Sequence, residues 1–87
     1  MSIVQELQRA RRSSHMGQAE LAERSGLSRM TVQRTESGAI DPRLSTLLVM
    51  ARALGLELMV VPSALRPMVE DFVRAGGRIV SQEPGVS

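Results

Sequence analysis

Residues 17–38 read GQAELAERSGLSRMTVQRTESG, and this stretch decides the fold. It holds two short helical patterns that are separated by Gly26 and Leu27. Gly26 can take a positive φ and so end the first helix abruptly. Ser28 is a good N-cap for the second helix, because its hydroxyl can accept a hydrogen bond from a free backbone N–H. We therefore predict two helices joined by a tight turn, the second of them ending near Gly38.

The second of these helices has two different sides at about 100° per residue. Its inner side carries Ser28, Thr31, Val32, Thr35 and Glu36. Its outer side carries Arg29, Met30, Gln33, Arg34 and Ser37. Such side chains suit a helix in the DNA major groove, where arginine can bind guanine, glutamine can bind adenine and methionine can contact a thymine methyl. A polar outer face is also typical of any solvated helix, but the spacing of the two helices favours the DNA interpretation.

The pattern extends well beyond these two helices, over roughly residues 3–58. The residues that carry it are Gln18, Leu21, Ala22, Gly26, Leu27, Ser28, Val32, Glu36, Gly38, Pro42, Thr46, Leu47, Ala51, Ala53, Leu54, Gly55 and Leu56. In these positions the chain resembles the Cro and phage-repressor family of helix-turn-helix proteins, also called the xenobiotic-response-element family. The resemblance implies a mainly α-helical, lambda-repressor-like bundle of four to five helices. Two positions depart from the family: Gly17 stands where Thr or Ser is usual, and Thr35 where a larger apolar residue is usual.

The resemblance also implies which residues meet DNA. Gln18, in the first turn of its helix, would anchor a DNA phosphate, where the helix N-terminus also favours an anion. Arg43 follows a loop that would run along the DNA backbone and could reach the minor groove. The complete predicted DNA-binding set is Gln18, Ser28, Arg29, Met30, Thr31, Gln33, Arg34, Ser37 and Arg43.

A structural ion pair between Arg11 and Glu36 is a further expectation from the family. The alternative is two independent surface charges. We favour the pair, because Glu36 lies on the inner side of its helix and would otherwise be a poorly solvated carboxylate. Such a pair would orient the second helix of the motif rather than add much net stability.

Composition argues against catalysis. The 87 residues make one small domain with no cysteine, a single histidine (His15) and a single aromatic residue (Phe72). We find no clustered carboxylates and no phosphate-binding glycine loop, so we expect no enzyme activity, metal or cofactor. The sequence has no apolar run of the roughly 18 residues that a membrane span needs, and no signal peptide. We therefore expect a cytoplasmic protein.

Charge is distributed unevenly along the chain. Residues 1–56 hold eight arginines and five acidic residues, a net charge of +3, whereas residues 57–87 carry a net charge of −1. A positive excess favours a polyanionic partner. This expectation of double-stranded DNA as a partner applies to the first part of the chain alone.

The remaining elements are predicted from periodicity. Apolar stripes predict helices over residues 2–14, 44–54 and 63–75. Residues 56–62 read LELMVVP and predict a buried β-strand, which needs a hydrogen-bonding partner. That partner would be residues 78–81 of the same chain or the same strand of a second subunit. The predicted organisation is a DNA-binding domain over residues 1–56, a dimerisation or partner-binding extension over 57–82, and a flexible tail over 83–87.

A helix-turn-helix core followed by one apolar strand also resembles the HipB-type antitoxins. Those proteins are dimers that pair C-terminal strands, repress their own operon and bind a HipA-type kinase toxin. The resemblance implies a homodimer on a palindromic operator, with an interface formed by Leu56, Leu58, Met59, Val60, Val61, Met68 and Phe72. Two functions remain open: a dimeric sequence-specific repressor, or a module that mainly neutralises a toxin protein and binds DNA secondarily.

Overall fold

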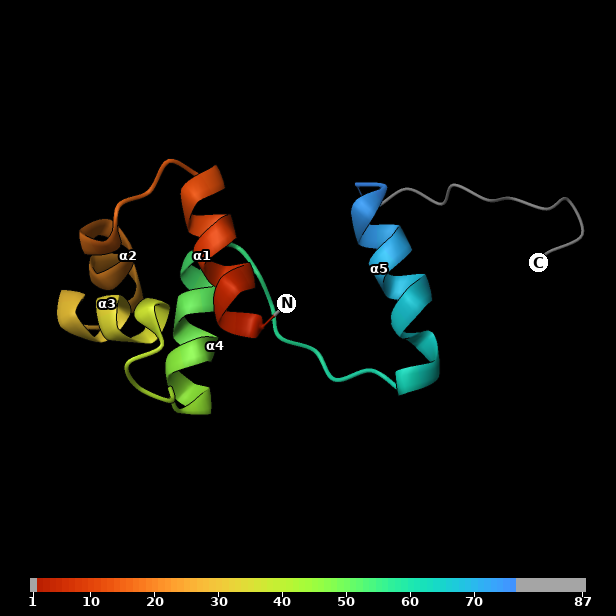
Figure 1. Cartoon of the computed structure of the whole chain (residues 1–87). Coiled ribbons are helices and arrows are strands. Elements are labelled where there is room, and N and C mark those ends of the chain that lie inside the picture. Colours follow the sequence, from red (N-terminus) through yellow and green to blue (C-terminus); the bar gives the residue numbers. More distant parts are fainter. Residues whose placement is uncertain (1, 77–87) are drawn as a thin grey trace, which may run out of the picture.

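The computed structural model describes residues 2–76. Within this range the elements are α1 (Ile3–Ser13), α2 (Gln18–Ser25), α3 (Arg29–Ser37), α4 (Leu44–Ala53), the short 3₁₀ helix η1 (Ser63–Leu65) and α5 (Arg66–Arg74). Helices α1 to α4 form a bundle, and α5 stands apart from it at the end of a long connection (Figure 1). The mainly helical fold is therefore confirmed.

Local sequence determines where the helices begin and end. Ser2 and Gln5 form a capping box at the start of α1, each side chain bonding the backbone N–H of the other residue. Gly26 ends α2 in the left-handed conformation, with φ of 75°, and Gly38 ends α3 in the same way with φ of 80°. Gly17 gives α2 no side-chain cap. The tight turn between α2 and α3 thus depends on a glycine at residue 26.

The core of the bundle is aliphatic. Helix α2 packs against α3 and α4, and α1 also contacts both α3 and α4. The buried apolar residues are Leu7, Met16, Leu21, Ala22, Val32, Met50 and Ala51. Each of the four helices contributes to this set, and α3 is held in place by packing on α1 and α2.

Thr35 is the polar exception in this core. Its side chain is fully buried, and its hydroxyl oxygen has no hydrogen-bond partner among the residues that the structure describes. The position matches the departure from the family pattern noted in the sequence. An unpaired buried hydroxyl destabilises a fold by about 1–3 kcal/mol.

Replacing Thr35 with valine should therefore stabilise the bundle by about 1 kcal/mol, because the shape is kept and the unpaired hydroxyl is removed. Chemical denaturation followed by circular dichroism measures this difference. Thr31→Val in the same helix is the matched control, since the Thr31 hydroxyl bonds Ser28 at 2.9 Å and its loss should not stabilise. Equal effects of the two changes, or destabilisation by Thr35→Val, would contradict the prediction.

The predicted β-strand over residues 56–62 is wrong. No strand occurs between residues 2 and 76, and Leu56 to Pro62 form a connection without regular secondary structure. A strand needs a neighbour to satisfy its backbone groups, and the bundle, being helical, offers no free sheet edge. The predicted burial of this segment is also wrong, because Met59 is 78% and Val60 101% exposed. The proposed partner at residues 78–81, like the tail over 83–87, lies outside the described range.

The last helix is formed as expected but is not covered by the bundle. Pro67 sits in the first turn of α5, where a missing N–H does no harm. Within the described range, only η1 packs closely on α5. The prediction that residues 57–82 are a separate extension is not tested by this arrangement and stays a prediction.

Candidate nucleic-acid interface

The N-terminus of α3 is held by Ser28. Its Oγ accepts a hydrogen bond from the Thr31 backbone N–H at 3.0 Å, and it also bonds the Thr31 hydroxyl. Val32 and Thr35 turn inward and are buried. This inner packing defines which side of α3 can face a ligand.

The outer side of α3 is exposed and polar. Arg29, Met30, Gln33, Arg34 and Ser37 all lie on the surface. In the described part of the chain, the side chains of Arg29, Gln33 and Arg34 make no hydrogen bond or ion pair. Their donors are therefore available to an external partner, which is what direct contact with base edges requires.

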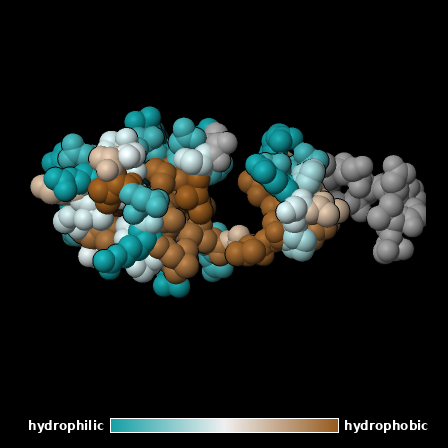
Figure 2. Space-filling view, turned by 60° about the horizontal axis from the view of Figure 1, so that its bottom comes forward, coloured by the Kyte–Doolittle hydropathy of each residue, from teal (hydrophilic) through white to brown (hydrophobic). Residues whose placement is uncertain are grey.

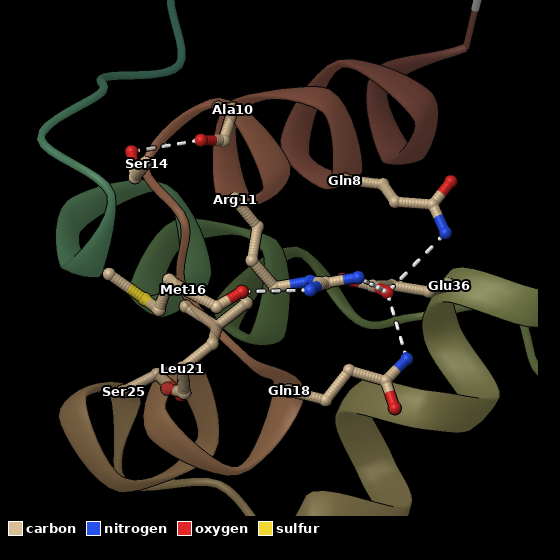
Figure 3. Close-up of polar contacts among 9 residues, drawn as sticks. All are labelled: Gln8, Ala10, Arg11, Ser14, Met16, Gln18, Leu21, Ser25 and Glu36. Atoms are coloured by element: carbon tan, nitrogen blue, oxygen red, sulfur yellow. Dashed lines mark hydrogen bonds and ion pairs between the residues drawn. The ribbon is translucent and has the colours of Figure 1, made fainter.

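Glu36 ties α3 to two other helices (Figure 3). Its carboxylate accepts hydrogen bonds from Arg11 Nε at 2.7 Å and Arg11 Nη2 at 2.8 Å, a bidentate pair. Gln18 Nε2 of α2 donates to the same carboxylate at 2.9 Å, and Gln8 Nε2 of α1 at 3.4 Å. Arg11 Nη1 also donates to the backbone carbonyl of Met16 at 2.9 Å. We call Gln8, Arg11, Gln18 and Glu36 the Glu36 network.

The Glu36 network is shielded from water. The Arg11 side chain is 10% and the Glu36 side chain 1% exposed. Burial by itself raises the pKa of Glu36, but the hydrogen bonds from Arg11 and Gln18, the charge of Arg11 and the bond from Gln8 together lower it below its usual value. Glu36 is thus held as a carboxylate, and it fixes the end of α3 relative to α1 and α2.

Two members of this network, Gln18 and Gln8, were not predicted as partners of Glu36. The side chain of Gln18, which we predicted to anchor a phosphate, is bonded to Glu36. Backbone N–H groups in the first turn of α2 have no partner within the helix and still offer a place for an anion. Gln8 was not predicted, although its position one turn before Arg11 could have indicated a shared partner.

The remaining predicted site residues are Arg43 and the residues of the predicted dimer interface. Arg43 is exposed and precedes the first turn of α4, at the end of the loop after α3. The predicted dimer residues lie elsewhere, on the connection and on α5. Met59, Val60, Met68 and Phe72 are exposed, whereas Leu58 and Val61 are half-buried.

Between residues 2 and 76, no group of three or more histidine or acidic side chains is placed to hold a metal ion. None of the helices described is both long and apolar enough to span a bilayer.

The geometry of α2, the turn at Gly26 and α3 defines a helix-turn-helix with an exposed second helix. A family model described as a helix-turn-helix domain matches residues 2–61, and the chain belongs to this family, of the Cro and phage-repressor type. It is 38% identical over 71 residues to a protein of Sinorhizobium fredii (strain NBRC 101917 / NGR234) named as the uncharacterized HTH-type transcriptional regulator y4dL. That match covers 82% of this chain but 36% of the relative, so the chain spans well under half of the relative's length. No solved structure matches the chain.

Proposed function

We propose that this chain binds duplex DNA sequence-specifically and represses transcription as a homodimer on a palindromic operator. The outer face of α3 is the observation that carries this proposal. Its arginines and glutamine are exposed and unengaged within the described residues, while the Glu36 network and the core hold the helix itself in place. A recognition helix needs this combination, because base contacts carry specificity when the reading side chains are presented by a rigid element.

Two further observations support the proposal. The net charge of +3 on residues 1–56 favours a polyanion. The relative from Sinorhizobium fredii is named as a transcriptional regulator, and the match includes the helix-turn-helix. The role that we propose is one of binding rather than catalysis.

Replacing Gln33 or Arg29 with alanine should weaken binding to the cognate site by about 1–3 kcal/mol and change binding to random duplex little. The cognate site can be selected from a random duplex library and affinities measured by fluorescence anisotropy. Arg74→Ala, which removes the same charge from α5, is the matched control for Arg29→Ala. Equal losses on cognate and random DNA would show that these side chains contact phosphate only.

The homodimer is proposed on the exposed apolar surface of residues 56–73. Helix-turn-helix proteins read half-sites about one helical turn apart, which requires two recognition helices at a fixed separation. Closed twofold symmetry supplies this separation and covers the apolar side chains of both copies. The chain is small, so association also adds burial that its own core cannot.

The intact chain should sediment as a dimer at tens of micromolar. Met59→Asp should give monomers that keep their helices but no longer bind a palindrome tightly, because a charge would be buried in the contact. Met30→Asp, the same change on the exposed face of α3, should leave the dimer intact. A monomeric wild-type chain would refute the proposed assembly.

A toxin protein as partner is the second candidate. The apolar side chains exposed on the connection and on α5 are the observation that favours it, since such patches mark interaction sites. If the dimer contact covers these side chains, a toxin has to bind elsewhere or compete with the second copy. Sedimentation of the chain mixed with proteins recovered from its native cell separates these possibilities.

A further inference from the structure

Met30 is the apolar exception on the outer side of α3. Its neighbours on that side are Arg29, Gln33, Arg34 and Ser37, which are all polar. Met30 is 57% exposed, whereas most of the other exposed apolar residues belong to the connection and α5, where Figure 2 shows hydrophobic side chains gathered. A single exposed apolar residue is common by itself. What Met30 can do therefore depends on where it points.

Met30 lies in the middle of the exposed side of α3. At about 100° per residue, it is about 160° around the helix from Val32 and about 140° from Thr35, the two buried residues of α3. Arg29 and Arg34 lie on either side of it. Met30 is also in the first turn of the helix, and the N-terminal residues of a recognition helix are those that contact base edges. Met30 therefore points at the bases when α3 enters the major groove.

The oxygen acceptors of α3 and its N-cap are bonded within the chain. The hydroxyls of Ser28 and Thr31 bond each other at 2.9 Å, and Ser37 Oγ donates to a backbone carbonyl of its own helix at 3.2 Å. The Glu36 carboxylate is buried with its ion-pair partner. Cytosine presents an amino donor in the major groove, which needs such an acceptor. The outer side instead contacts DNA through arginine donors, one amide and one thioether side chain.

We propose that Met30 packs on the C5-methyl group of a thymine in each half-site and so selects thymine at that position. This inference rests on the DNA binding proposed above and specifies one of the base pairs that are recognised. The thymine methyl is the one methyl group that unmodified base pairs present in the major groove. Against any other base edge, the methionine would cover donors or acceptors without giving them a hydrogen bond, which is unfavourable.

Gln33 extends this recognition to a neighbouring base pair. It is exposed, and its amide makes no hydrogen bond in the described part of the chain, so it can bind N6 and N7 of an adenine. Gln33 lies three residues after Met30, so the two residues are about 4.5 Å apart along the helix axis. Successive base pairs are about 3.4 Å apart. The half-site therefore carries an adenine about one or two base pairs from the thymine.

Replacing single thymines of the selected site with deoxyuridine tests the Met30 contact. Deoxyuridine lacks the methyl group and keeps every hydrogen-bonding group of thymine. At one position in each half-site, the wild type should lose affinity about fourfold, the effect of one buried methyl group. Met30→Ala should bind the unmodified site more weakly and show no further loss at that position. Ile3→Ala removes an exposed apolar side chain from α1 and is the matched control, which should respond to deoxyuridine as the wild type does.

Replacing single adenines with 7-deazaadenine tests the neighbouring contact. This base lacks the N7 acceptor and keeps its pairing with thymine. One position in each half-site should lose affinity about tenfold in the wild type, and Gln33→Ala should not respond there. That position should lie about one or two base pairs from the thymine identified with deoxyuridine. A larger separation would show that the two side chains do not recognise neighbouring pairs.

Other results would overturn the Met30 contact. A selected site in which no thymine responds to deoxyuridine would exclude it. Equal losses in the wild type and in Met30→Ala would show that the methyl group acts through another residue or through DNA shape. Full affinity for a site with 5-methylcytosine and guanine in place of the thymine and adenine pair would show that any methyl group is accepted, so thymine is not selected. Failure to select any sequence would instead contradict the proposed DNA binding itself, and this inference with it.

Discussion

Replacing Arg11 with methionine should destabilise the helical bundle by about 3–5 kcal/mol, the usual result of removing one partner from a buried ion pair. The methionine fills similar space but leaves the carboxylate of Glu36, 1% exposed, without its bidentate partner. Gln8 and Gln18 remain as neutral donors and cannot balance the charge. A small domain has about 5–15 kcal/mol of total stability. Denaturant unfolding should therefore show a large shift in midpoint.

Two further variants test whether the loss of stability in Arg11→Met comes from the buried, unpaired charge of Glu36. Adding Glu36→Leu to Arg11→Met should recover most of the lost stability, because no uncompensated charge is then left inside. Arg24→Met breaks an exposed pair with Glu20, with side chains 58% and 47% exposed, and should cost less than about 1 kcal/mol. If Arg11→Met and Arg24→Met cost the same, or if the double variant is no more stable than Arg11→Met, the proposed role of the buried pair is wrong.

The pH dependence of stability follows from the same pair. The pKa of Glu36 in the folded chain lies below its ordinary value of 4.5. Ionised Glu36 therefore makes its full contribution to the free energy of unfolding at a pH above the ordinary pKa. This contribution is lost as the pH falls through the lowered pKa of the folded chain, because Glu36 binds a proton more readily in the unfolded chain than in the folded one. Arg11→Met should show less of this acid-side loss than the wild type.

The bundle was predictable because each of its signals is local. Ser28 and Gly26 determine where α3 begins and where α2 ends, and the apolar spacing selects the buried sides. These signals act within a few residues, so the sequence alone carries them. The Glu36 network was harder to predict from the sequence. The family resemblance suggested Arg11 as a partner of Glu36, but the contacts from Gln8 and Gln18 depend on how three helices meet.

The connection after α4 could not be predicted in the same way. Residues 56–62 have the composition of a buried strand, yet a strand is defined by its neighbour, and composition does not say whether a neighbour exists. Met59 and Val60 are apolar but exposed, so side-chain type alone did not predict their burial correctly. If a second copy covers this region, the composition reflects the assembly and not the isolated chain.

DNA affinity should fall about a thousandfold between about 50 and 200 mM monovalent salt. Residues 1–56 carry a net charge of +3 in each copy, so a dimer that places these residues on DNA would displace counterions from about six phosphates. Anisotropy titrations at a series of salt concentrations give the slope of log affinity against log salt. Arg43→Gln removes one predicted phosphate contact per copy and should make that slope shallower by about 2 for the dimer.

The slope also separates phosphate contact from base reading. Arg43→Gln should weaken cognate and random duplex alike, whereas Gln33→Ala carries no charge change and should leave the slope unchanged while lowering specificity. Arg74→Gln on α5 is the charge-matched control, because α5 is proposed to face the partner copy and not DNA. A slope near zero would mean that the positive face is not the DNA contact, and a steep slope unaffected by Arg43→Gln would place the phosphate contacts on other arginines.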